Sequence, residues 1–156
     1  MLHLIPAPLH RLLYRAAHRL RKHWLHWRGG EVHGCSVIAR DAAGRVLLVR
    51  HSYGSGLWSF PGGGLNRGEE PAVGAAREFA EELRCGLTDL RHLGTLDEQF
   101  HGARNVAHVF AGEVSGEPRP DMREIVEARF FALDDLPKNR SRLVDARLAL
   151  LPRQMP

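Results

Sequence analysis

The sequence has no run of about 18 apolar residues, so no membrane-spanning helix is expected. The N-terminus starts with apolar residues, but Arg and His interrupt every later turn, and no secretory leader is indicated. Cysteine is scarce, since Cys35 and Cys85 are the only two, and they lack the spacing of metal ligands. We expect both to be reduced, partly buried thiols. These absences are consistent with a cytoplasmic setting.

Two catalytic motifs are also missing. The absence of a G-x-S-x-G nucleophile elbow argues against an esterase, and the absence of a phosphate-binding P-loop argues against an ATPase. The 156 residues suffice for one domain with a core. Shares of 44% apolar and 26% charged residues are typical of a globular protein.

Positive charge is concentrated at one end of the chain. The whole chain has 22 Lys and Arg against 18 Asp and Glu. Residues 1–28 hold six of the basic residues and no acid, which leaves 16 basic and 18 acidic residues in the remainder. The isoelectric point of 9.7 therefore belongs to the N-terminal segment, and no DNA binding is expected of the main domain.

We divide the chain into a basic amphipathic segment, residues 1–28, and a main domain, residues 29–156. Apolar residues at three- and four-residue spacing predict a helix over residues 9–27. Three roles are open for this helix. In order of preference, it packs on the domain or on a second subunit of a homodimer, lies on an anionic membrane surface, or contacts RNA.

Hydrophobic periodicity predicts the elements of the main domain. A helix with Pro71 in its first turn is expected over residues 71–83, and a final helix over residues 143–151. The expected strands are 32–40, 45–50, 58–60, 90–96, 106–114 and 127–133. This order predicts a layered α+β or α/β domain.

The helix over residues 71–83 is chemically asymmetric. At about 100° per residue, one side holds Arg77, Glu78, Glu81 and Glu82. The residues expected to face a core on the other side are Val73, Ala76, Phe79, Ala80 and Leu83. Neighbouring carboxylates repel one another unless a divalent cation lies between them, and their hard oxygens suit Mg²⁺ or Mn²⁺. A solvated acidic face with Arg77 as counter-ion explains the pattern equally well.

The stretch Pro61 to Gly86, PGGGLNRGEEPAVGAAREFAEELRCG, resembles the Nudix box, G-x5-E-x7-R-E-U-x-E-E-x-G-U, where U is a bulky aliphatic residue. The matching positions are Gly63, Glu69, Arg77, Glu78, Glu81 and Glu82, with Phe79 at the first U. Arg84 and Cys85 replace the final G-U pair. Because Gly86 follows two residues later, the helix is expected to run longer before a glycine cap. The resemblance spans residues 32 to 150.

This resemblance implies the Nudix fold, a mixed β-sheet sandwiched between helices (α/β/α). It also implies a Mg²⁺-dependent or Mn²⁺-dependent hydrolase that cleaves a phosphoanhydride bond in a nucleoside diphosphate linked to another group. Nucleotide sugars, nucleoside triphosphates, dinucleoside polyphosphates and capped RNA ends are all candidate substrates. The alternative is a catalytically silent Nudix domain that binds a nucleotide for regulation, although such a domain would be expected to lose acids that this box retains.

The resemblance further implies a role for each residue of the box. Glu81 and Glu82 are the main metal ligands, Glu78 is a further ligand or the base that activates water, and the carbonyl of Gly62 adds a ligand. Arg77 pairs with nearby box carboxylates and fixes their orientation, while Glu69 is structural. Some relatives use a later acid as an extra ligand or base, and the candidates here are Glu124 and Glu127, with Glu98 and Glu113 ranked behind them.

Substrate-binding candidates lie near the ends of predicted strands. Arg50 and Arg104 have the chemistry to bind phosphate, and Tyr53 and Phe100 have rings that can stack on a base. For each of the four, packing or a solvated loop is the simpler interpretation. The ten histidines show no metal-ligand spacing, and five of them lie in residues 1–28.

Overall fold

A computed structural model of the chain describes residues 31–100 and 103–152. The helix predicted over residues 9–27 lies outside these ranges. Within them, no helix is long and apolar enough to cross a membrane.

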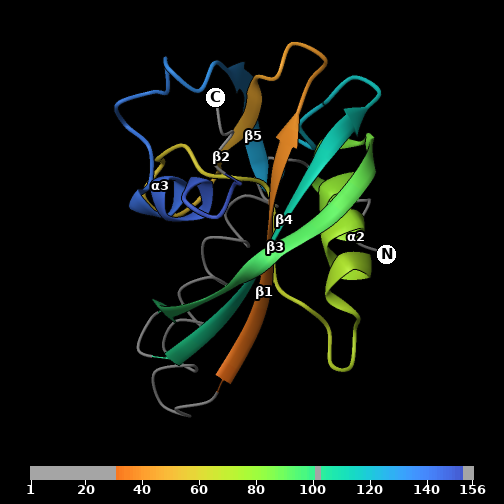
Figure 1. Cartoon of the computed structure of the whole chain (residues 1–156), viewed down its shortest axis with the longest axis vertical. Helices are drawn as coiled ribbons and strands as arrows, with labels where there is room; N and C mark the ends of the chain where they lie inside the picture. Colours follow the sequence, from red (N-terminus) through yellow and green to blue (C-terminus); the bar gives the residue numbers. More distant parts are fainter. Residues whose placement is uncertain (1–30, 101–102, 153–156) are drawn as a thin grey trace.

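The described residues form one mixed five-stranded sheet and two helices (Figure 1). The strands are β1 Glu31–Arg40, β2 Val46–His51, β3 Gly86–Phe100, β4 Ala103–Ser115 and β5 Ile125–Phe131. Their order across the sheet is β3-β4-β1-β2-β5, in which β1 and β4 run parallel and the other neighbours run antiparallel. Helix α2, Pro71–Leu83, precedes β3, and helix α3, Arg142–Leu148, follows β5.

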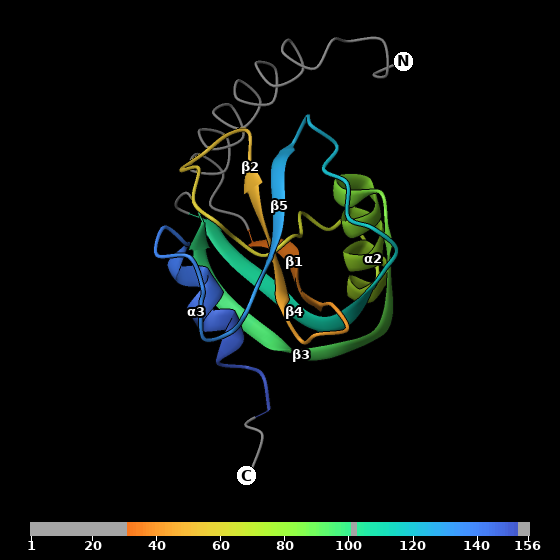
Figure 2. The ribbon, with the colours of Figure 1, turned by 90° about the horizontal axis from the view of Figure 1, so that it is seen from above.

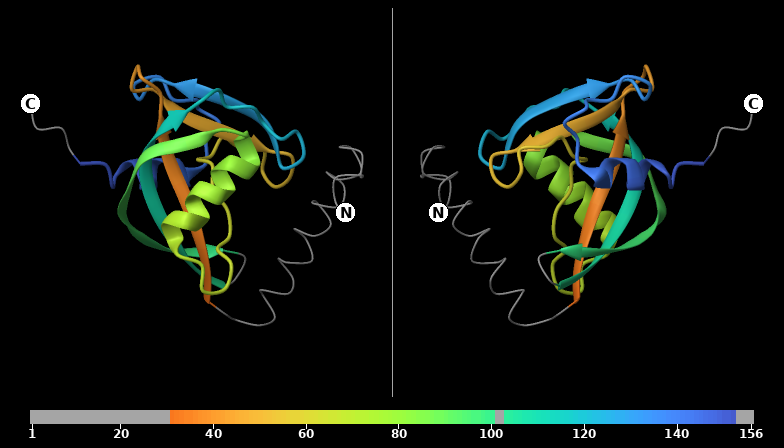
Figure 3. Two further views of the ribbon diagram at one scale, coloured as in Figure 1. Left: turned by 90° about the vertical axis from the view of Figure 1, so that its right-hand side faces the viewer. Right: turned by 90° about the vertical axis from the view of Figure 1, so that its left-hand side faces the viewer.

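The two helices cover opposite faces of the sheet, as Figures 2 and 3 show. Successive side chains of a strand point to opposite faces. Val37 of β1 therefore belongs to the same buried cluster as Phe79 of α2, whereas its neighbour Ile38 belongs to the cluster that contains Val144 of α3. The predicted α/β/α arrangement around a mixed sheet is confirmed.

Residues 59–64, the glycine segment, fill the space between β1 and β2, which pair directly only beside the turn that joins them. The N–H groups of Cys35 and Val37 donate to carbonyls of this segment, both at 2.9 Å. Val49 of β2 exchanges two backbone hydrogen bonds with Ser59, at 2.8 and 3.0 Å. The strand predicted over residues 58–60 is thus a set of isolated bridges, and the glycines that follow are held within the sheet.

Helix α2 has the predicted bounds, but its predicted exit is wrong. The helix ends at Leu83, and Arg84 adopts the left-handed conformation, with φ of 55°. Its N–H donates to the carbonyl of Ala80 at 2.9 Å, which closes the last turn. Arg84 therefore occupies the cap position itself, and Gly86 already begins β3, four residues before the predicted start of that strand.

The predicted core face of α2 is also partly wrong. Phe79 and Leu83 are fully buried, but Val73 is 59% exposed, and Ala76 and Ala80 are exposed as well. Glu82, expected on a solvated or metal-binding side, has only 3% of its surface exposed. The error has a physical cause: carboxylates that line an interior site were counted as facing away from the core, which rotated the expected apolar face.

Candidate active site

A cleft of about 740 Å³ opens beside the glycine segment. Its walls come from β1, the loop after β2, α2 and α3. Gly62 and Gly63 lie in the lining, together with Glu78, Glu81 and Glu124. Several acids thus border one hollow that is within the size range of small-molecule sites.

Glu82 lies behind this wall, in the interior. One of its carboxylate oxygens accepts a hydrogen bond from the N–H of Gly62 at 3.2 Å. Burial raises the pKa of Glu82 well above its usual range, and the negative charges of Glu124, Glu78 and Asp121 raise it further. A buried carboxylate among other carboxylates is costly unless a positive charge neutralises it.

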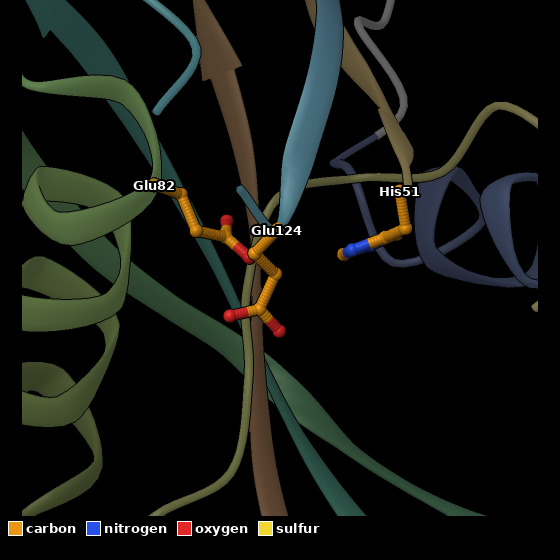
Figure 4. Close-up of side chains that lie close together, drawn as sticks. All are labelled: His51, Glu82 and Glu124. Atoms are coloured by element: carbon orange, nitrogen blue, oxygen red, sulfur yellow. The ribbon is translucent and has the colours of Figure 1, made fainter. Parts of the chain in front are cut away.

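Glu124 and His51 approach Glu82 from the other side of the cleft (Figure 4). Glu124 directly precedes β5, and His51 is the last residue of β2. One ligand atom from each of the three residues lies within 4.8 Å of the other two. Two carboxylates and an imidazole form a donor set that fits a divalent cation.

Arg77 binds the acids at the outer side of the site. Its Nε and Nη2 donate to the two carboxylate oxygens of Glu69 at 2.8 and 2.9 Å. Its Nη1 donates to Glu78 at 2.8 Å and to Glu81 at 3.4 Å. These hydrogen bonds lower the pKa of Glu69 to about 2, whereas burial raises the pKa of Glu78 despite its bond to Arg77. The guanidinium therefore fixes three acids of the box in place.

Two glycines lie in close approach to their neighbours, and the backbone contact at Gly62 requires glycine. A Cβ at Gly62, whose φ is +147°, would lie 2.2 Å from the carbonyl oxygen of Cys35. A Cβ at Gly63 would lie 2.5 Å from a carboxylate oxygen of Glu78. The absence of side chains here lets the sheet and the acids of α2 approach each other.

The structure separates the four later acids that the sequence left open. Glu127 forms an ion pair with Arg50 at 3.1 Å. Glu98 is in a nearly buried ion pair with an arginine of α3, and Glu113 is exposed on β4. Of the four, Glu124 alone lies beside the acids of the box.

The substrate-binding candidates are also dispersed. Tyr53 lines the cleft, and its hydroxyl donates to Glu124. Arg50 is held in the ion pair described above, and exposed Arg104 pairs with acids of β1 and β3. Phe100 ends β3, and its side chain lies outside what the structure describes.

His51 was not among the residues predicted to bind metal. Its partners Glu82 and Glu124 are far away in the sequence, so no spacing pattern connects them. The sequence indicated only that His51 lies at the end of a strand that leads into a glycine-containing loop. Such positions are too common to identify one histidine as a metal ligand.

Fold and site together define a class: mixed-sheet α/β/α proteins in which one helix presents a cluster of acids to a glycine-rich segment. The family model of the NUDIX domain matches residues 32–153. The chain therefore belongs to the Nudix hydrolase family.

Individual relatives agree with this assignment but differ in their reactions. NAD-capped RNA hydrolase NudC of Vibrio vulnificus (strain CMCP6) is 30% identical over 104 residues, which cover 66% of this chain and 40% of that protein. An isopentenyl-diphosphate Delta-isomerase of Frankia alni is 34% identical over 104 residues, covering 58% of this chain and 52% of that protein. The chain thus spans about half or less of these relatives.

A solved structure aligns with a larger share of this chain than either sequence relative does. The crystal structure of the MutT NUDIX hydrolase from Burkholderia pseudomallei has a TM-score of 0.72 and 29% identity, covering 78% of this chain and 98% of that one. Because the two sequence relatives carry the names of different reactions, the reaction of this chain has to be inferred from its site.

Proposed function

We propose that this protein is a Mg²⁺-dependent or Mn²⁺-dependent hydrolase that cleaves a phosphoanhydride bond in a nucleoside diphosphate linked to another group. One observation carries the proposal: Glu78 and Glu124 line the cleft, and buried Glu82 lies directly behind them. Among the described residues, no Lys or Arg forms an ion pair with Glu82 or Glu124. This arrangement fits a site whose positive charge comes from a bound cation.

Each residue of the site has a proposed role. Glu82 and Glu124 would hold the cation with Glu81 and the carbonyl of Gly62, and Glu78 would serve as a further ligand or as the base that accepts a proton from water. A bound divalent cation would neutralise the diphosphate and lower the pKa of a coordinated water. Arg77 would position Glu78 and Glu81, because its planar guanidinium contacts both.

The substrate class is supported by the rest of the cleft. Beyond the acids, the lining includes the apolar side chains of Leu57, Phe60, Leu143 and Val144, and the ring of Tyr53. Such a surface suits the less polar part of a nucleotide, while the acid end suits a cation-bound diphosphate. The name of the Vibrio relative, an NAD-capped RNA hydrolase, points to the same chemistry.

The test is a panel of nucleotide sugars, nucleoside triphosphates, dinucleoside polyphosphates and capped RNA, incubated with Mg²⁺ or Mn²⁺. Released nucleoside monophosphate and phosphate are measured. We expect turnover of at least one class by the wild type and by Glu117→Gln, an exposed control, and none by Glu82→Gln. Nucleotide binding without turnover would instead support the catalytically silent, regulatory alternative.

The basic segment is a separate proposal. We infer that residues 1–28 are distinct from the catalytic domain and pack on it or on a second subunit. Deletion of these residues should change the oligomeric state or the solubility but not the turnover. Loss of liposome binding or of RNA binding instead would favour the membrane-surface or RNA role.

A further inference from the structure

A histidine lies beside the acids that the proposed function assigns to the cation site. His51 ends β2, Glu124 precedes β5 and Glu82 lies near the end of α2, and their side chains point into one space (Figure 4). One ligand atom of each lies within 4.8 Å of the others. Two elements and one loop, far apart in the sequence, thus contribute one donor each.

The loop that carries Glu124 is held firmly to α2. The carboxylate of Asp121 accepts hydrogen bonds from the N–H groups of Arg123, Glu124 and Ile125 at 2.9 to 3.0 Å. The N–H of Asp121 donates to the carbonyl of Glu82 at 2.9 Å. The side chain of Asp121 therefore shapes the loop that carries Glu124. Its backbone N–H ties the same loop to Glu82.

The same loop is tied to the segment that follows His51. The N–H of Ser52 donates to the carbonyl of Glu124 at 2.8 Å, and its hydroxyl donates to the carbonyl of Arg123 at 2.7 Å. The hydroxyl of Tyr53 donates to the carboxylate of Glu124. These contacts hold the residues that follow His51 against the loop of Glu124 and so place His51 beside the two acids, as expected for a preorganised ligand set.

The negative charge around Glu82, Glu124 and His51 favours the binding of a cation and disfavours a further acidic ligand. Glu78 and Asp121 add negative charge next to Glu82. Arg77 is bonded to Glu69, Glu78 and Glu81, at the outer side of the helix. A neutral imidazole can donate its lone pair to a cation without adding further negative charge.

We infer that a ring nitrogen of His51 is a ligand of the cation site, together with Glu82 and Glu124, and that the site favours Mn²⁺ and Co²⁺ over Mg²⁺. This inference rests on the cation site of the proposed function. Mn²⁺ and Co²⁺ accept an imidazole nitrogen as a ligand more readily than Mg²⁺, which prefers oxygen. The competing interpretation is that His51 only packs against Tyr53, whose ring centroid is 5.2 Å away.

The first measurement is calorimetric titration of the full chain with Mg²⁺, Mn²⁺ and Co²⁺. The variants are His51→Gln and His108→Gln. His108, on β4, is the matched control because it is partly buried like His51 but does not line the cleft. We expect His51→Gln to weaken Mn²⁺ and Co²⁺ binding roughly tenfold or more, with Mg²⁺ binding changed much less. His108→Gln should change neither.

The second measurement reads the ligand directly. With at most one equivalent of Mn²⁺, the electron spin-echo envelope of the wild type should contain ¹⁴N modulation from a coordinated imidazole. Labelling with ¹⁵N-histidine should replace it with ¹⁵N modulation, which tests the wild type without any variant. The modulation should disappear in His51→Gln and persist in His108→Gln, with folding of both checked by circular dichroism.

The outcomes separate the inference from the proposed function. Mn²⁺ binding without nitrogen modulation in the wild type, or modulation that persists in His51→Gln, would overturn the role of His51 alone. The proposed function would still stand if Glu82→Gln abolished cation binding in the same assay. Failure of the wild type to bind any of the three cations would overturn both.

Discussion

The backbone N–H of Gly62 donates to the carboxylate of Glu82 across 3.2 Å, which joins the glycine segment of the sheet to the buried acid of α2. The contact depends on the missing side chain, because a Cβ at Gly62 would lie 2.2 Å from the carbonyl oxygen of Cys35. The position of the acid and the hydrogen bonding of β1 are therefore linked through one residue.

Gly62→Ala should destabilise the protein severely. The added methyl group must displace backbone of β1, and alanine is strained at the φ of +147°. We expect a loss of about 3 kcal/mol or more in the free energy of unfolding, measured with urea. Gly64→Ala is the control, since a Cβ there would meet nothing within 4 Å. Equal stability of the two variants would contradict the described path of the segment.

Arg84→Gly should stabilise the protein. Arg84 holds a left-handed conformation, with φ of 55°, which disfavours a residue with a Cβ by about 1 kcal/mol. Glycine removes that strain but has more freedom in the unfolded chain, so a net gain of about 0.5 kcal/mol is expected. Arg84→Ala keeps the Cβ and should bring no gain. A lower melting temperature for Arg84→Gly than for Arg84→Ala would refute the assigned cap.

Glu98→Gln should destabilise the contact between α3 and the sheet. Glu98 pairs with Arg147 at 3.0 Å, and the two side chains are only 12% and 9% exposed. Removing one charge leaves the other buried, which costs about 3 kcal/mol. The control is Glu117→Gln, whose pair with Arg119 is largely exposed and should contribute little to stability. Similar melting temperatures for both variants would argue against a structural role for the buried pair.

Without a cation, stability should fall as the pH rises. The pKa of Glu82 is raised in the folded protein above the ordinary value of 4.5. Above that pH the unfolded chain releases this proton while the folded chain retains it, so stability present at low pH is lost as the pH approaches the folded pKa. Melting temperatures of the wild type in EDTA should therefore decrease as the pH rises above 4.5, and Mn²⁺ should restore them most at the higher pH.

Glu82→Gln is the control for this pH dependence. A neutral amide has no proton to lose, so the variant should show a shallower decrease and little response to Mn²⁺. The remaining slope would come from Glu78, whose pKa is raised in the same direction by burial. Identical slopes for wild type and variant would mean that Glu82 is not the group responsible.

Features with strong local signals could be predicted from the sequence. Pro71 and the apolar periodicity placed α2 with its observed bounds, and the strands on either side of the first turn were close to their observed ends. The exit of α2 could not be predicted, because nothing in the sequence indicates that Arg84 would take a conformation usually left to glycine.

Features that depend on tertiary contacts could not be derived. Glu124 was one of two preferred acids, together with Glu127, and only the fold brings it beside Glu82. His51 was overlooked as a metal ligand because its neighbours come from other parts of the chain. The face of α2 was misjudged because the burial of Glu82 depends on a glycine segment packed against the helix, which periodicity within the helix does not report.

The insertion of the glycine segment between β1 and β2 has a consequence for how the site moves. Its backbone shares hydrogen bonds with Cys35 and Val37 on one side and Val49 on the other, so it cannot swing away without opening the middle of the sheet. In hydrogen–deuterium exchange, these amides should be among the slowest, at rates set by global unfolding rather than by loop motion. Adaptation to a new substrate would therefore have to come from the loop after β2 and from α3, the parts of the wall that can change without melting the fold.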